Sequence, residues 1–164
     1  MLNEFRHKKI RDWCFFDFGI SSYPTLIITF IYGAFYAKEI AYTPEIGTSN
    51  WGYAISIGSI FSFLIFLSVL FRGNKNNNLG VRLFKSSFYI LILSVSLLGF
   101  FNQKSNEYFP LIFVGISLVA FEILNLFYNL SLHDVSENKK RGLISNLGWA
   151  TGYVGGLLSL ITVL

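Results

Sequence analysis

The stretch FPLIFVGISLVAFEILNLFYNL, residues 109–130, carries one charged side chain, Glu122, in an otherwise uncharged and mostly apolar run. A helix of about 20 such residues crosses the hydrocarbon core of a bilayer, which is about 30 Å thick. The run therefore predicts a membrane-spanning helix. Similar runs recur along the chain, so we expect an all-α membrane protein that forms a single transmembrane unit over residues 1–164. About five transmembrane helices are predicted, at residues 13–37, 51–71, 83–101, 109–130 and 143–164.

The overall composition agrees with this fold class. Of the 164 residues, 53% are hydrophobic and 13% are charged, which leaves too little charge to coat a water-soluble domain of this size. The net charge of +4 is spread over short clusters between the apolar runs. That distribution is typical of topology signals and speaks against nucleic acid as a partner. Cys14 is the sole cysteine, so no intrachain disulfide forms, and we expect a small buried side chain there.

The basic residues also predict the orientation in the membrane. All but two of the thirteen Lys and Arg lie before the first run, around the second loop or in the fourth loop. The exceptions, Lys38 and Lys104, lie in the first and third loops near acidic residues. Because cytoplasmic loops carry the excess of Lys and Arg, the N-terminus is predicted to be cytoplasmic.

Local breakers refine the helix predictions. Residues 42–47 and 73–78 are turn-forming and should connect helices. Gly19 and Pro24 should loosen the first helix, as happens where a helix bends around a cavity. The last apolar run ends at Leu164 without flanking anchors, so we expect the chain to be incomplete relative to its relatives.

Two acidic side chains, Asp17 and Glu122, fall inside predicted spans. A carboxylate at the centre of a span costs roughly 2.5–3.5 kcal/mol on insertion scales. Asp17 lies about one turn inside the first span, where either a functional role or a structural or capping role is open. Glu122 lies near the middle of the fourth span.

The fourth predicted helix carries a polar stripe. Glu122, Asn125 and Asn129 lie at i, i+3 and i+7, and therefore on one face. Such a stripe is expected to face a bundle interior or an aqueous cavity. It can form part of a substrate or proton pathway, or it can hold helices together by hydrogen bonds. Both interpretations remain open at this level.

Small residues mark the last predicted helix. Gly148 and Gly152 form a G-x-x-x-G pair, and Gly155 and Gly156 follow. This spacing lets two helices approach closely, so it predicts helix packing in preference to ligand contact.

No motif for an enzyme, a cofactor or a metal site is found in the sequence. There is no P-loop, no H-E-x-x-H and no G-x-S-x-G. His133 and Asp134 are predicted to lie in a solvated loop, because His7 is the one other histidine of the chain. We therefore expect no catalytic residues, no cofactor and no bound metal.

Two stretches resemble a known family. Residues 11–25, RDWCFFDFGISSYPT, resemble the W-x-x-Y-D-x-A-N-S-A-[FY] start of major facilitator permeases related to the vacuole effluxers of autophagy. Asp17 matches the aspartate of that motif, whereas Gly19 and Ile20 replace its A-N pair. Residues 127–135 and 141–156 resemble the family's F-Y-N-x-x-L-x-D and R-G-x-x-S-x-x-G-W-x-x-G-Y-x-G-G.

The resemblance implies a fold and a function. Major facilitators have about twelve helices in two six-helix halves, with the solute site between the halves. This chain would be the N-terminal part of such a bundle in a bacterial inner membrane. The first and fourth helices line the cavity in that fold, which implies a pathway role for Asp17, Glu122, Asn125 and Asn129. The loop after residue 71 lacks the aspartate of the family's G-x-x-x-D-R motif.

Three functional hypotheses follow. The first is a secondary transporter or effluxer of a small, amino-acid-like solute, embedded in the lipid bilayer. The second is a small non-transporting membrane protein that assembles with a partner through its glycine-rich fifth helix, or a non-functional gene remnant. The third is a carrier whose second half is a separate polypeptide.

Overall fold

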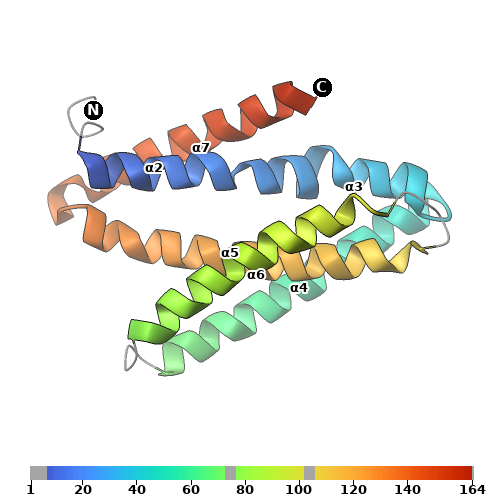
Figure 1. The fold of residues 1–164 in the computed structure, drawn as a ribbon, viewed down its shortest axis with the longest axis horizontal. Helices are drawn as coiled ribbons and strands as arrows, with labels where there is room; N and C mark the ends of the chain where they lie inside the picture. The colour runs from blue at the N-terminus through green and yellow to red at the C-terminus, as the bar shows by residue number, and fades with distance from the viewer. Residues whose placement is uncertain (1–6, 73–76, 102–105, 164) are drawn as a thin grey trace. The chain divides into compact units, whose positions relative to one another are not determined.

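The computed structural model describes residues 7–72, 77–101 and 106–163, and all regular structure in these residues is helical (Figure 1). Two segments, η1 and η2, are π-helical, and η4 is a 3-10 turn. The elements in chain order are α2 (Lys8–Ile20), η1 (Pro24–Phe30), α3 (Tyr32–Phe35), η2 (Tyr36–Ile40), α4 (Pro44–Arg72), α5 (Asn77–Leu98), α6 (Tyr108–Val135), η4 (Asn138–Lys140) and α7 (Arg141–Val163).

The protein is an all-α membrane protein, as predicted. Among the described residues, four helical stretches are long and apolar enough to cross a membrane: Lys8–Ile40, Pro44–Phe71, Leu79–Leu98 and Tyr108–Val135. The fifth predicted span, residues 143–164, forms the helix α7. Its last residue, Leu164, lies outside the described residues, so the crossing of the membrane by this segment stays a prediction.

The helices begin and end at different residues from those predicted. α4 begins at Pro44 because the Thr43 hydroxyl accepts the backbone N–H of Ile46 at 3.3 Å and proline is well tolerated at the first helical position. The predicted 42–47 turn is therefore shorter. α5 includes Asn77 and Asn78 of the predicted 73–78 loop, and residues 73–76 lie outside the described ranges.

α6 also runs further than predicted. It continues through His133 and Asp134 to Val135, so the expected loop at these two residues is wrong, although both side chains are exposed. A helix continues beyond the apolar run when its end is solvated, because its backbone bonds do not depend on side-chain polarity.

The first spanning stretch is interrupted near its middle. α2 ends at Ile20, and the chain rewinds as the π-helical η1 from Pro24. The wider turn is closed by a bond from the Ile31 N–H to the Leu26 carbonyl oxygen at 3.1 Å. Proline lacks the N–H that a regular helix needs, so the loosening predicted from Gly19 and Pro24 is found here. Such π-helical turns are frequent at functional sites.

The chain divides into two compact units, and each is described separately. The first consists of Met1–Tyr32 with Tyr128–Leu164. In it, α7 lies along α2 and η1 (Figure 1). Its core is one cluster of buried side chains from α2, the end of α6 and α7: Ile10, Trp13, Cys14, Tyr128, Ile144 and Leu147.

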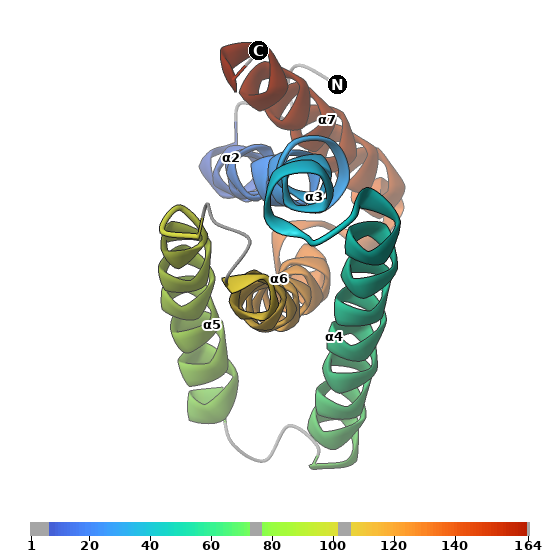
Figure 2. The same cartoon turned by 90° about the vertical axis from the view of Figure 1, so that its right-hand side faces the viewer.

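The second unit is Gly33–Phe127, in which α4 and α5 lie on either side of α6 (Figure 2). α4 approaches α6 closely, since a Cβ at Gly58 would lie 3.0 Å from the Leu118 side chain. On the other flank, the Phe84 and Phe127 rings of α5 and α6 meet edge to face, with centroids 6.4 Å apart.

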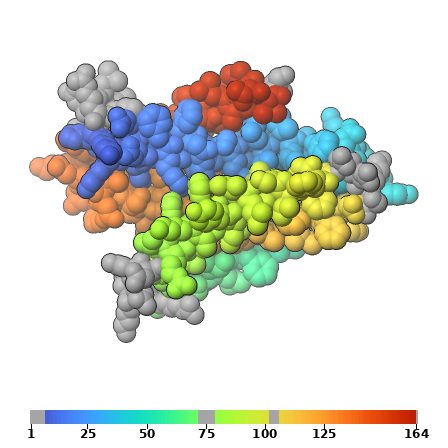
Figure 3. Space-filling model, in the orientation of Figure 1, coloured from blue at the N-terminus to red at the C-terminus, as the bar shows by residue number. Residues whose placement is uncertain are grey.

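Large apolar side chains cover the outside of this unit. α5 forms part of the surface seen in Figure 3, in green to yellow, and its exposed side chains include Phe88, Tyr89 and Leu93. Helices that are apolar on their outer faces as well as their inner ones suit a hydrocarbon environment. The surface therefore agrees with the membrane fold class.

The packing of α7 on α2 makes a testable prediction. A Cβ at Gly155 would overlap the Phe18 carbonyl group, whereas a Cβ at Gly142, in the same helix, meets nothing within 4 Å. We expect Gly155→Ala to destabilise the fold by about 1–3 kcal/mol because the two backbones must separate. Gly142→Ala should be neutral or slightly stabilising, since alanine favours helix. Thermal unfolding of the purified protein in detergent measures both, and equal melting temperatures would contradict the close contact.

Candidate functional site

The first unit holds a polar site around Asp17. Trp13, Asp17 and Ser21 follow at intervals of four residues and so share one face of α2 and the turn after it. This face is turned toward α7, because a Cβ at Gly152 would lie 2.5 Å from Asp17 Oδ2 and 2.8 Å from Ser21 Oγ. Asp17 is half-buried there.

Glycines of α7 form the floor of this site. The four glycines Gly148, Gly152, Gly155 and Gly156 are all buried. Cβ atoms at these positions would meet, in order, Trp13, Asp17, the Phe18 backbone and the Thr25 hydroxyl. The missing side chains thus let α2 and η1 approach α7 closely, and the carboxyl of Asp17 reaches the α7 backbone.

Hydrogen bonds between the two segments reinforce this contact. The Thr151 hydroxyl of α7 donates to the Cys14 carbonyl oxygen at 3.1 Å or to the Gly148 carbonyl oxygen at 2.7 Å. On the η1 side, the Thr25 hydroxyl donates to the Ser21 carbonyl oxygen at 2.8 Å. At the end of α2, the Ser22 hydroxyl donates to the Gly19 carbonyl oxygen at 2.8 Å and so satisfies one of the carbonyl oxygens that the helix leaves free there.

Tyr128, in the last turns of α6, closes the site. The Trp13 indole N–H donates to the Tyr128 carbonyl oxygen and to Ser131 Oγ, at 3.1 Å each. The Trp13 and Tyr128 rings stack with centroids 4.1 Å apart and planes 12° from parallel. Phe16 stacks on the Tyr128 ring as well, at 5.8 Å. These contacts fix the ring, so the position of its hydroxyl is set by packing.

The Tyr128 hydroxyl is buried and interacts with the Asp17 carboxyl, as does the Ser21 hydroxyl. The Tyr128 hydroxyl forms no hydrogen bond of good geometry with the described part of the chain. No described Lys, Arg or His side chain forms an ion pair with Asp17; the pair that does form joins the exposed side chains of Arg11 and Asp12. A carboxyl set between hydroxyls, with no cation beside it, can take up a proton or a positively charged group of a solute.

The three residues of the predicted polar stripe on α6 do not all belong to the same compact unit. Glu122 and Asn125 are half-buried and belong to the second unit, whereas Asn129 is exposed and belongs to the first. The residue of α6 that joins the Asp17 site is Tyr128, between the two asparagines. The His133 ring at the end of α6 contacts the Arg141 guanidinium. Among the described residues, no three His, Cys, Asp or Glu side chains gather as they would around a metal ion.

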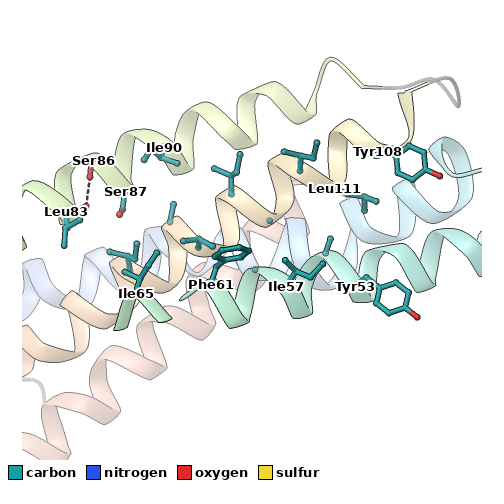
Figure 4. Close-up of a pocket in the computed structure, with 18 of the residues that line it drawn as sticks. Tyr53, Ile57, Phe61, Ile65, Leu83, Ser86, Ser87, Ile90, Tyr108 and Leu111 are labelled. Carbon is teal, nitrogen blue, oxygen red and sulfur yellow. Dashed lines mark hydrogen bonds between the residues drawn. The ribbon is translucent and has the colours of Figure 1, made fainter. Parts of the chain in front are cut away.

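A second feature is an apolar cavity of about 680 Å³ in the second unit, between α4, α5 and α6 (Figure 4). Ile57, Phe61 and Ile65 of α4 face it at intervals of four residues. Glu122 does not line it, although its neighbours Ile123 and Ala120 do. The size is that of a small-molecule site.

Sequence analysis missed several of these residues. Ser21 and Trp13 lie four residues from Asp17, and that spacing in the sequence could have placed all three on one helix face. Tyr128 carried no such signal, because only the tertiary fold brings α6 beside α2. The apolar cavity was also missed, since its lining of isoleucine, leucine and small residues reads as ordinary helix core.

Comparison with known proteins gives one relative. The chain is 25% identical over 159 residues to an uncharacterized MFS-type transporter, YxiO, of Bacillus subtilis (strain 168), where MFS denotes the major facilitator superfamily. The similarity covers 94% of this chain and 36% of that transporter. The chain therefore spans about a third of the length of the relative that it matches. No family model and no solved structure matches the chain.

The unbonded hydroxyl of Tyr128 generates a prediction about stability. Tyr128→Phe keeps the ring stacking on Trp13 and removes only the oxygen, so we expect an unchanged or slightly higher melting temperature. A buried polar group without a good partner costs roughly 1–3 kcal/mol. Tyr153→Phe, at an exposed position of α7, is the matched control. A clear loss of thermal stability in Tyr128→Phe alone would mean that the hydroxyl is firmly bonded in the protein.

Proposed function

We propose that these residues form the N-terminal part of a major facilitator secondary transporter, which moves a small solute across a bacterial inner membrane by alternating access. The observation that carries the proposal is the similarity to an MFS-type transporter over 94% of the chain. The four helices able to span a membrane support it. In a carrier of that relative's length, further helices would complete the solute path.

The Asp17 site gives the proposal a chemical centre. Ionisable side chains inside membrane helices commonly mark ion and substrate pathways. Here the carboxyl lies beside a broken helix, and interrupted helices are tolerated where they line a cavity. We assign to Asp17 the binding of a proton or of a cationic group of the solute, and to Ser21 the positioning of that carboxyl. Glu122 and Asn125, in the second unit, are further candidates for a substrate or proton pathway.

The alternative of a partner-binding membrane protein loses its main support. That hypothesis uses the glycine-rich face of the fifth helix as the interface. In the structure, this face of α7 is covered by α2 and η1 of the same chain. A partner would have to use a different surface.

Neutralising Asp17 tests the proposal. Asp17→Asn keeps the size and polarity of the side chain but can neither exchange a proton nor hold a cation. We expect the full-length protein with this change to lose solute movement at least tenfold, measured by comparing small solutes inside and outside cells with and without the gene. Glu122→Gln should change the rate of solute transport or the pH dependence of that rate.

The matched control is Asp12→Asn, which removes an exposed acid five residues away. It should transport as the wild type does. Equal transport by Asp17→Asn and wild type, with both proteins present in the membrane at the same level, would remove the assigned role. If the gene causes no solute difference in any condition, the transporter proposal itself is overturned.

The proposed cytoplasmic N-terminus has its own test. Cys14 is fully buried, so it provides a background that a membrane-impermeant maleimide should not label. Lys38 and Lys139 are exposed, beyond opposite ends of the predicted spans. We expect Lys38→Cys to be labelled in intact cells and Lys139→Cys only after permeabilisation. The reverse pattern would place the N-terminus outside.

A further inference from the structure

The apolar cavity of the second unit has polar residues at its two ends and none between them. Tyr53 and Tyr108 lie at one end, and Ser86 and Ser87 lie at the other (Figure 4). Asn50, the third polar or tyrosine lining residue of α4 and α6, precedes Tyr53 by about one helical turn. The Ser86 hydroxyl already donates to the Leu83 carbonyl oxygen at 3.0 Å. The middle is lined entirely by aliphatic, glycine and phenylalanine residues of α4, α5 and α6. An occupant must therefore be apolar along most of its length.

The setting of the cavity narrows the choice of occupant. α4, α5 and α6 each contain a stretch able to span a membrane, so the medium around the cavity is lipid hydrocarbon. From Tyr53 to Ile65, α4 rises about 18 Å at 1.5 Å per residue. That length is a little more than half of the hydrocarbon core, which is about 30 Å thick. It matches an acyl chain of one leaflet.

A lipid tail suits this space. The cavity has a volume of about 680 Å³ and is lined by apolar side chains over most of its length. An acyl chain is apolar and flexible, so it can follow the lining and can enter from the surrounding bilayer.

The charge at one end points to the headgroup. Arg82 and Lys85 lie in the first turns of α5 and are exposed. Arg82 stands four residues before Ser86 and hence on the same face, at the end of the cavity. Neither cation forms an ion pair with a described residue. Basic side chains between membrane helices are suited to anionic lipid headgroups.

We propose that this cavity binds one acyl chain of an anionic phospholipid, with the lipid phosphate held at Arg82 and Lys85. The site is separate from Asp17 and does not depend on transport. It would make the second unit a lipid-binding element of the protein, in which a tail fills the space that α4 and α5 leave over α6.

Lipid retention tests the proposal. The full-length protein is purified in a mild detergent, exposed to phosphatidylglycerol or to phosphatidylcholine, washed, and analysed by native mass spectrometry. We expect about one phosphatidylglycerol per protein and less phosphatidylcholine. Gly115→Leu should abolish retention, because Gly115 lines the cavity and a Cβ there first meets the Ala54 carbonyl oxygen at 3.9 Å, so the side chain can fill the space.

Matched variants separate the tail from the headgroup. Gly52→Leu adds the same side chain at an exposed position of α4 outside the cavity and should bind as the wild type does. Arg82→Ala should retain phosphatidylglycerol about fivefold less well, the factor that corresponds to about 1 kcal/mol per cation near an anionic lipid. Lys139→Ala, an exposed cation of the first unit, should have no such effect.

Two results would overturn the assigned tail site: no retained lipid in the wild type, or undiminished retention in folded Gly115→Leu. The assigned headgroup contact would be overturned if the wild type retained both lipids equally and Arg82→Ala changed neither. Arg82 is exposed, so its variant decides the headgroup question even if Gly115→Leu does not fold. Because no readout involves solute movement, failure here is distinguishable from failure of the transporter proposal.

Discussion

Close contact between the glycine face of α7 and the broken first helix organises the whole first unit. The backbone of Phe18 lies so near Gly155 that a single added carbon would overlap it. With no hydrophobic effect to drive helices together inside a bilayer, dispersion contacts and interhelical hydrogen bonds must supply the attraction, and both require short distances. The Thr151 bond to the Cys14 carbonyl oxygen is one that forms only because the backbones approach this closely.

This contact also decides what Asp17 can do. Pro24 interrupts the helix just after the carboxyl, and Gly152 leaves room for the carboxyl against α7. Trp13 then fixes Tyr128 through the bond from its indole N–H to the Tyr128 carbonyl oxygen and through ring stacking, which sets the hydroxyl beside the acid. The acid is thus held by rigid aromatic and backbone groups instead of by a cation. A carboxyl without a fixed counter-charge remains available to a proton or to a solute.

In the second unit, α4 and α5 pack against different sides of α6. Gly58 lets α4 approach α6, while the rings of Phe84 and Phe127 hold α5 to the other flank of α6. α4 and α5 meet α6 on different sides, so an apolar cavity remains between them. In water such a cavity would collapse or be covered, but in a bilayer it borders a medium that can fill it.

The sequence by itself determined the fold class. A helix satisfies the hydrogen bonds of its own backbone inside a hydrocarbon core, and long uncharged apolar runs therefore predict helices. It also located the break near Pro24, which follows from the missing N–H. It did not determine where α4, α5 and α6 begin and end, since caps such as Thr43 and solvated last turns extend helices past the apolar runs.

Nor did the sequence determine the partners of Asp17. Ser21 shares the helix face of Asp17, so its spacing in the sequence could have predicted it. Tyr128 lies on α6, where the spacing pointed instead to Glu122, Asn125 and Asn129. Only tertiary structure decided that Tyr128 faces the acid, because which residue of α6 meets α2 depends on the stacking of its ring on Trp13. Periodicity assigns a residue to a face of its own helix, and packing between helices decides what that face meets.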